Sequence, residues 1–485
     1  MRTYQFKKAL TILVVLLMGF SFGCTTETPE DSSPSEAPAP AEEPEEPADD
    51  SATDPVTDPV TEPVTEPVTE PVTEPVTEPV TEASIEPSAA YWPCFHGPNG
   101  DNKSTETGLL TEWPEGGPEL LWQVGGFGHG YSGVTIADGR IFLTGNEGED
   151  DATQEIIYCL DIAGNTLWTA PNGSGWNGSF EGTRSTPTID GDRVYAYSPT
   201  GRICCLNVED GEEIWNVNVL ENYESVHPTW AQAESVKLDG DRVICSPCGA
   251  KASVVALDKM TGDEIWTTPS VGEAKPGYCT PTICEWEGLR IVLTMSGQEF
   301  IGANAETGEL LFTHPHPTEH DINATDPIFH EGRIFITSGY GTTGGEMLDL
   351  TVNGDQASVE VAWTNPDLDN QHGGVILHEG YLYGSAHKTG RGSWFCVDWE
   401  TGETQWADRG VGMGSLTYAD GMLYLMSESN KFGLIRATPE AYELTGEYTI
   451  PREGKGKTWA HPVVVDGKLY IRHGEFLYCH NVSAE

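Results

Sequence analysis

The strongest pattern in the chain is a short apolar stretch, a turn that contains glycine, and a second short stretch that ends in an aromatic residue. Residues 253–258 (SVVALD) form the first stretch, Thr261 and Gly262 lie at the turn, and the second stretch ends at Trp266. Glycine adopts positive φ without strain, and β-favouring residues lie on both sides of it. The pattern predicts a β-hairpin.

The same hairpin recurs along the chain. It is found at residues 159–168, 205–215, 302–312 and 396–406, and in degenerate form at 348–363 and 433–448. The aromatic residues that end these units are 42 to 51 residues apart and are Trp122, Trp168, Trp215, Trp266, Phe312, Trp363, Trp406 and Tyr448. A period of about 40 to 50 residues with four strands per unit is typical of a β-propeller blade.

A second hairpin precedes most of these units, with Asp-Gly or Glu-Gly at its turn. It occupies residues 135–143, 188–196, 237–245, 328–336, 375–384, 417–425 and 463–471. Two hairpins per period make a four-stranded antiparallel sheet, and we count eight such units, of which the fourth (280–312) is the least regular. The last unit (460–482) has no final Trp, so the strand at 119–122 is predicted to complete it and to leave no exposed sheet edge at the closure. The prediction is an all-β, eight-bladed propeller over residues 119–485, preceded by a lead-in segment at residues 91–118.

The first 23 residues have the features of an export signal. Arg2, Lys7 and Lys8 precede an apolar run at residues 9–22 that is short for a membrane span. The run ends in Ser-Phe-Gly-Cys, which resembles a bacterial lipobox with Cys24 as the lipidated residue. We expect an exported lipoprotein held at the cell envelope, and Thr25 in place of Asp favours the outer membrane; the alternative is a plain secretory signal.

Residues 24–90 have the composition of an extended tether. They contain seven successive TDPV or TEPV tetrads at residues 53–80, and nineteen acidic residues without Lys or Arg. Such a segment buries too little apolar surface to offset the entropy of ordering. The segment is predicted to be a disordered spacer between the anchor and the propeller.

The body is strongly acidic as well. The whole chain has a formal net charge of −51, and the part from residue 91 carries 57 acidic against 22 basic residues. This balance argues against nucleic acid as a partner and against direct adsorption to anionic membranes.

The lead-in sequence YWPCFHGPNGDNKSTETGLLTEWPEGGPELLW, together with the repeated TG-x-x-x-W hairpin, resembles the PQQ-like β-propeller repeat family. The match is closest to exported members whose segment begins W-P-x-x-R-G-P, and His96 stands here in place of Arg. The family includes quinoprotein dehydrogenases and the BamB-type outer-membrane assembly lipoprotein. The resemblance implies a monomeric binding or scaffold module, with no cofactor, that contacts envelope proteins.

Two alternatives remain open. One is an oxidoreductase that uses PQQ with calcium, for which Asp321, Asn323 and Asp326 are the candidate ligands and base. The other is a surface propeller that binds carbohydrate.

The tryptophans of the repeat offer large apolar area between adjacent blades, and in the family they dock blade on blade. We assign this structural role to Trp168, Trp215, Trp266, Trp363 and Trp406. The export signal implies an oxidising setting, so Cys245 with Cys248 and Cys279 with Cys284 are predicted to form local disulfides. Neither CxxC spacing nor any other motif predicts a metal site.

A binding site is expected where the innermost strands begin, because side chains from all blades converge there. The segments that enter these strands are rich in aromatic and polar groups, which suit a sugar, a small cofactor or a metal. The candidates for this funnel are Tyr131, Arg184, His227, Trp230, Tyr278, His320, Asp321, Asp326, His372, Trp459 and His461.

Overall fold

The computed structural model describes residues 90–272, 275–340, 344–451 and 453–484. The chain divides into two units, Met1–Val80 and Thr81–Glu485, and the first lies outside the described residues. The predicted signal, the lipidation site at Cys24 and residues 24–89 of the predicted tether lie outside the described residues, whereas its last residue, Ala90, is buried in the core. In the part of the chain that is described, no helix is long and apolar enough to cross a membrane.

The described chain forms eight four-stranded antiparallel sheets, which confirms the predicted eight-bladed propeller. The first four blades are β2 (Thr135–Ala137), β3 (Arg140–Glu147), β4 (Gln154–Asp161) and β5 (Thr166–Ser174); β6 (Thr188–Asp190), β7 (Arg193–Tyr197), β8 (Arg202–Asn207) and β9 (Glu213–Asn218); β10 (Lys237–Asp239), β11 (Arg242–Cys245), β12 (Val255–Asp258) and β13 (Glu264–Thr267); and β14 (Thr282–Trp286), β15 (Leu289–Met295), β16 (Glu299–Asn304) and β17 (Leu310–Pro315).

The fifth to seventh blades repeat this order and the eighth is completed by the first strand of the chain. They are β18 (Ile328–His330), β19 (Arg333–Thr337), β20 (Gly345–Asn353) and β21 (Gln356–Asn365); β22 (Val375–His378), β23 (Tyr381–Ser385), β24 (Trp394–Asp398) and β25 (Thr404–Asp408); β26 (Gly414–Ala419), β27 (Met422–Ser427), β28 (Lys431–Arg436) and β29 (Leu444–Thr449); and β30 (Val463–Val465), β31 (Lys468–His473), β32 (Phe476–Asn481) and β1 (Leu120–Gly125). The short helices η1 (Asp150–Ala152), α1 (Val219–Asn222) and η2 (Glu319–Asp321) lie in connections.

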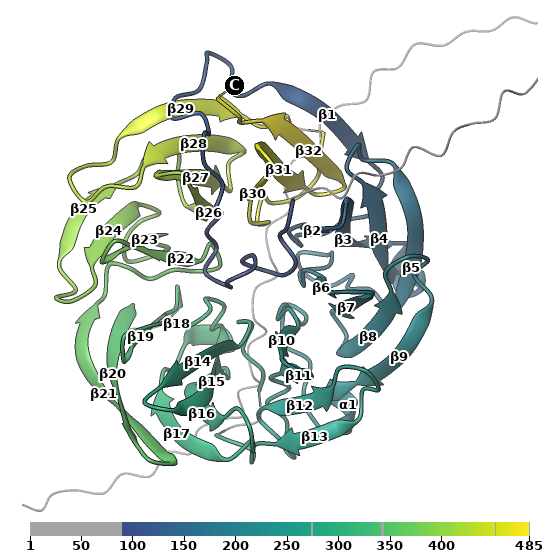
Figure 1. Cartoon of the computed structure of the whole chain (residues 1–485), viewed down its shortest axis with the longest axis vertical. Coiled ribbons are helices and arrows are strands. Elements are labelled where there is room, and N and C mark those ends of the chain that lie inside the picture. Colours follow the sequence, from purple (N-terminus) through teal and green to yellow (C-terminus); the bar gives the residue numbers. More distant parts are fainter. Residues whose placement is uncertain (1–89, 273–274, 341–343, 452, 485) are drawn as a thin grey trace, which may run out of the picture. The chain divides into compact units, whose positions relative to one another are not determined.

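The blades surround a common centre, with β2, β6, β10 and their equivalents innermost (Figure 1). The middle strands are largely buried, the inner strands are mostly buried or half-buried, and the outer strands are mostly exposed. In the last blade β1 pairs antiparallel with β32, and Trp122 lies opposite Cys479. The N-terminal strand thus closes the ring, as the missing fourth strand of the last repeat predicted.

Adjacent blades are joined by a contact between a tryptophan and a turn glycine. The ring of Trp215 on β9 covers Gly262 in the β12–β13 turn, where an added Cβ would lie 2.8 Å from the ring. The indole N–H of Trp215 donates to the carbonyl oxygen of Lys259 in the same turn, at 3.0 Å. The same ring-on-glycine contact joins the pairs Trp168–Gly211, Trp266–Gly308 and Trp363–Gly402, and Trp406 donates to the carbonyl of Thr438. Glycine is therefore needed at these turns for two reasons: it adopts positive φ without strain, and it leaves space for the ring of the neighbouring blade.

The two predicted disulfides are not formed, because the structure has all four cysteines as buried free thiols. Cys284 lies opposite Ile291, whereas the thiol of Cys279 lies against Thr294, three residues farther along β15. At about 3.3 Å per residue this is roughly 10 Å along the strand, which exceeds the Cα separation of about 7 Å that a disulfide allows. Cys248 instead directs its thiol to a backbone carbonyl, that of Ser253.

Substitution of the turn glycine measures how much the contact with tryptophan restricts the space at that position. Gly262→Ala places a methyl group against the Trp215 ring, whereas Gly288→Ala, at a similar positive φ, meets open space. Both variants incur left-handed backbone strain of about 1 to 2 kcal/mol. Gly262→Ala is expected to lose about 1 to 3 kcal/mol more from overpacking. Urea unfolding of the two variants measures this difference, and equal losses would contradict the contact.

Hydrogen bonds between Glu346 and two histidines, which join the fourth and fifth blades, make stability depend on pH. Glu346 on β20 contacts His314 at 3.2 Å and His316 at 2.6 Å. Burial alone would raise the pKa of Glu346, but the hydrogen bonds to the two histidines outweigh it and lower this pKa to about 2.

Because the folded pKa is depressed, this stabilisation is present above the ordinary pKa of 4.5 and is lost as the pH falls toward 2. Glu346→Gln is therefore expected to cost roughly 3 kcal/mol at pH 6 to 7, and progressively less below pH 4.5. Glu360→Gln, at an exposed position on β21, is the control and is expected to change stability little. Melting curves from pH 7 to pH 2.5 test this, and a loss that does not change with pH would contradict it.

Candidate functional site

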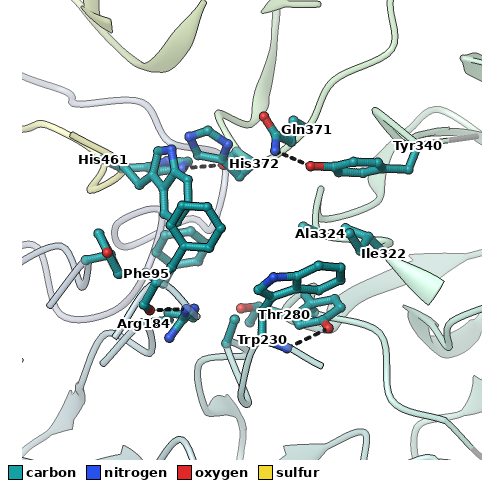
Figure 2. A pocket seen from close by; sticks show the side chains of 15 residues that line it. Phe95, Arg184, Trp230, Thr280, Ile322, Ala324, Tyr340, Gln371, His372 and His461 are labelled. Atoms are coloured by element: carbon teal, nitrogen blue, oxygen red, sulfur yellow. Dashed lines mark hydrogen bonds between the residues drawn. The ribbon is translucent and has the colours of Figure 1, made fainter. Parts of the chain in front are cut away.

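A pocket of about 240 Å³ opens at the centre of the ring (Figure 2). Most of its lining comes from the segments that lead into the innermost strands, as the sequence predicted for a funnel. Seven of the eleven predicted residues line it and lie two to seven residues before an inner strand: Tyr131, Arg184, Trp230, Tyr278, His372, Trp459 and His461.

The other four predicted residues do not line the pocket. His227 is exposed in the connection before β10. His320 is also exposed, with its ring 5.8 Å from that of Trp230. Asp321 pairs with Lys275 at 2.8 Å. Asp326 lies below the pocket, where its carboxylate accepts the N–H of Thr280 at 2.7 Å.

Sequence reasoning missed eight lining residues. Thr280, Ile322, Ala324, Gln371 and Ala233 occupy the same segments before inner strands, so their position was a usable signal. Phe180 lies in the connection before β6, like Arg184, but farther from the strand, whereas Phe95 and Tyr340 come from the lead-in segment and from the connection after β19. The position before an inner strand therefore does not predict Phe95 and Tyr340, which only the tertiary structure brings to the centre.

One wall of the pocket is a cluster of aromatic rings around Trp459. The ring centroid of Trp459 lies 4.9 Å from that of Tyr131, 5.0 Å from that of Phe180 and 5.4 Å from that of His372. Its indole N–H donates to Glu428 at 2.5 Å, which fixes the plane of the ring. The wall is therefore a rigid apolar surface.

The other side of the pocket carries Trp230 and Tyr340, across from His461 (Figure 2). The backbone N–H of Trp230 donates to the Tyr278 hydroxyl at 3.4 Å. The amide of Gln371 donates to the Tyr340 hydroxyl at 2.6 Å. Both phenols thus accept a protein hydrogen bond and keep their own O–H for another acceptor.

Arg184 supplies the positive charge of the pocket. Its guanidinium donates to the carbonyls of Gly182 at 2.7 Å and Phe180 at 2.6 Å, and lies 5.4 Å from the centre of the Tyr131 ring. Burial lowers the pKa of Arg184 to about 10, so it remains charged at neutral pH. Within the described residues no carboxylate forms an ion pair with it.

The lead-in segment contributes Phe95 to the lining, and we call its residues 92–102 the floor of the pocket. In Figure 1 this segment runs across the middle of the ring. Its backbone bonds to inner strands of the first and seventh blades. Trp92 pairs with Ile136 of β2, and Asn102 accepts the backbone N–H of Tyr418 of β26. Phe95 becomes part of the lining and stacks on His96, with centroids 3.8 Å apart.

His96 holds this floor in place. One ring nitrogen lies 3.2 Å from the carboxylate of Asp326, and the other lies 3.2 Å from Nδ1 of His461. His461 in turn contacts the carbonyl oxygen of His372 at 2.9 Å. Burial lowers the pKa values of His461 and His372, the latter to about 4, so both are neutral at pH 7. The residue that replaces the family's Arg thus links the floor to two blades.

The residues proposed for PQQ with calcium do not fit that role. Asn323 is fully buried and donates to the backbone carbonyls of Ser296, Gly297 and His316, Asp321 is held by Lys275 and Gln298, and Asp326 pairs with His96. None of the three lines the pocket. Across the described ranges, no group of three or more His, Cys, Asp or Glu is arranged to hold a metal ion.

Fold and pocket together define a closed, eight-bladed propeller of the PQQ-like repeat class. A family model described as outer membrane protein assembly factor BamB matches residues 152–408, more than half of the chain, and the chain belongs to this PQQ-like β-propeller family.

Individual relatives are more distant. BamB of Escherichia coli (strain K12) is 30% identical over 113 residues, which are 22% of this chain and 27% of that protein, so the alignment spans about a quarter of that relative's length. The structure of BamB from Moraxella catarrhalis has a TM-score of 0.52 at 11% identity and covers 76% of this chain and 98% of that one. A quinohemoprotein alcohol dehydrogenase from Comamonas testosteroni has a TM-score of 0.55 at 12% identity and covers 83% and 82%. At these identities the two structures show a shared fold alone.

Thermal melting tests whether the protein binds PQQ with calcium. We expect PQQ with calcium to leave the melting temperature of the full chain unchanged, because none of the three candidate residues lines the pocket. A ligand at about a hundred times its Kd would add about 2.7 kcal/mol, which a melt resolves. A clear rise, abolished in Asp321→Asn but kept in Asp349→Asn at an exposed position on β20, would contradict this expectation.

Proposed function

We propose that this chain is an envelope-anchored lipoprotein whose propeller is a non-enzymatic, monomeric scaffold in outer-membrane protein assembly. The observation that carries the proposal is the match of residues 152–408 to the BamB family model. Asp321 is held by Lys275 and Asp326 contacts His96, and neither lines the pocket, which favours this function over quinone chemistry.

The N-terminal sequence supports the anchored location. The signal and the lipobox-like residues before Cys24 suit a lipid anchor. At the polyproline rise of about 3.1 Å per residue, the tether at residues 24–90 reaches on the order of 200 Å when fully stretched. Such a spacer lets the propeller meet partners away from the membrane surface.

The exposed side chains of the outer strands are consistent with a protein partner. On four outer strands the residue directly before the aromatic is aliphatic and 43% to 47% exposed: Leu121, Leu167, Ile214 and Ile265. The outer strand of each blade also has an edge that no other strand of its sheet covers. Exposed apolar side chains beside a free strand edge are the features by which an extended segment of another protein adds to a sheet.

Capture of partners from the native envelope tests the proposal. We expect the tagged full chain, cross-linked in cells, to retain components of the outer-membrane β-barrel assembly machinery, and loss of the chain to reduce β-barrel proteins in the outer membrane. Leu167→Asp with Ile214→Asp is expected to lower this capture at unchanged melting temperature. Thr169→Asp, at an exposed position on the same strand as Leu167, is the matched control. Capture that lacks these components, with normal β-barrel levels in cells without the chain, would refute the function.

A further inference from the structure

The central pocket has the parts of a small-ligand site that the scaffold role leaves unused. Its lining includes the rings of Trp459, Trp230 and Tyr131, and its volume of about 240 Å³ suits a single ring and not a long chain. Phe95 of the lead-in segment is a further aromatic ring of the lining. A ligand with an apolar face can stack against these rings.

Hydrogen-bonding groups surround these faces on several sides. The hydroxyls of Tyr278 and Tyr340 already accept protein N–H groups, so each can donate its hydrogen. The side-chain oxygen of Gln371 accepts no protein hydrogen bond among the described contacts, and Thr280 adds a hydroxyl at the wall. Apolar faces with polar groups at their edges match a sugar, which has C–H faces and a rim of hydroxyls. A flat aromatic ligand would leave most of these groups unpaired, at a cost in affinity.

The charge of the lining residues narrows the class of ligand further. Among the described residues that line the pocket, Arg184 alone is charged at neutral pH, because His372 and His461 are neutral and no Asp or Glu is in the lining. The guanidinium has hydrogen atoms left after its two bonds to backbone carbonyls, and its fork matches a carboxylate. The acidic body repels anions, but salt screens this repulsion beyond about 8 Å at physiological ionic strength.

We propose that the pocket binds one acidic sugar unit of the uronic acid type. The C–H face of the sugar stacks on the aromatic wall, its hydroxyls bond to Tyr278, Tyr340 and Gln371, and its carboxylate bonds to the free edge of Arg184. The site lies in the recess at the ring centre, whereas the proposed partner surface lies on the outer strands. It therefore does not rest on the proposed assembly function.

Titration of the purified full chain with D-glucuronate tests the site, with D-glucose as the uncharged ring of the same shape. Calorimetry gives the affinity, and a change in tryptophan fluorescence serves as a second readout, since Trp230 and Trp459 are the two of the fourteen tryptophans that line the pocket. We expect saturable binding of glucuronate and binding of glucose that is weaker by about tenfold or more, since one charge-assisted contact is lost. Equal affinities, no binding of either sugar, or tight binding of PQQ in their place would overturn the proposal.

Two arginine variants separate the site from general charge effects. Arg184→Gln is expected to weaken glucuronate binding about tenfold and to leave glucose unchanged, whereas Arg184→Lys keeps part of the preference. Arg436→Gln removes the same charge from an exposed position on β28 and is expected to bind as the unaltered chain does. A melting temperature of Arg184→Gln equal to that of the unaltered chain shows that the fold is intact. Equal losses in Arg184→Gln and Arg436→Gln, or no loss in Arg184→Gln, would overturn the role of Arg184.

Discussion

The packing of a tryptophan ring on a glycine of the next blade sets the geometry on which the rest of this propeller depends. The ring of Trp215 occupies the space where a side chain at residue 262 would stand, and its N–H bonds to the same turn. A large rigid ring buries much area with few rotatable bonds, so each contact fixes both the distance and the angle between two blades. Repeated around the ring, these contacts decide where the inner strands converge and how wide the central space is.

Closure adds a second constraint, which acts on the lead-in segment. The residues before β1 pair with the first blade at Trp92 and with the seventh blade at Lys103, and only then does the chain enter β1 of the last blade. The crossing chain is held by backbone bonds at both sides and by His96 in the middle, between Asp326 and His461. The lead-in segment thereby becomes the floor of the pocket, and the side chains of His96, Asp326 and His461 bond to one another.

The contacts within the fold also decide which polar groups are free to face the pocket. The carboxylates nearest the centre are bound within the fold: Asp326 to the floor, Asp321 to Lys275, and Glu428 to the indole of Trp459. What remains facing the pocket is aromatic surface, hydroxyls, an amide and the unpaired charge of Arg184. The centre of a highly acidic protein is thus left with a local positive charge, a contrast that the overall net charge hides.

The sequence by itself determined the repeat, the strands and the blade contacts, because these depend on local periodicity and on residues at a fixed distance from a turn. It also indicated most of the pocket: Tyr131, Arg184 and Tyr278 each precede an inner strand by four residues, and the propeller brings that position to the centre. Only the tertiary structure decided the floor of the pocket and the partners of its polar side chains. The contact of His96 with Asp326 joins residues 230 positions apart, and no periodicity predicts which partner a side chain meets across a closed ring. The same holds for the cysteines, since spacing along the chain suggested disulfides, whereas the register of β14 on β15 keeps the thiols of Cys279 and Cys284 apart.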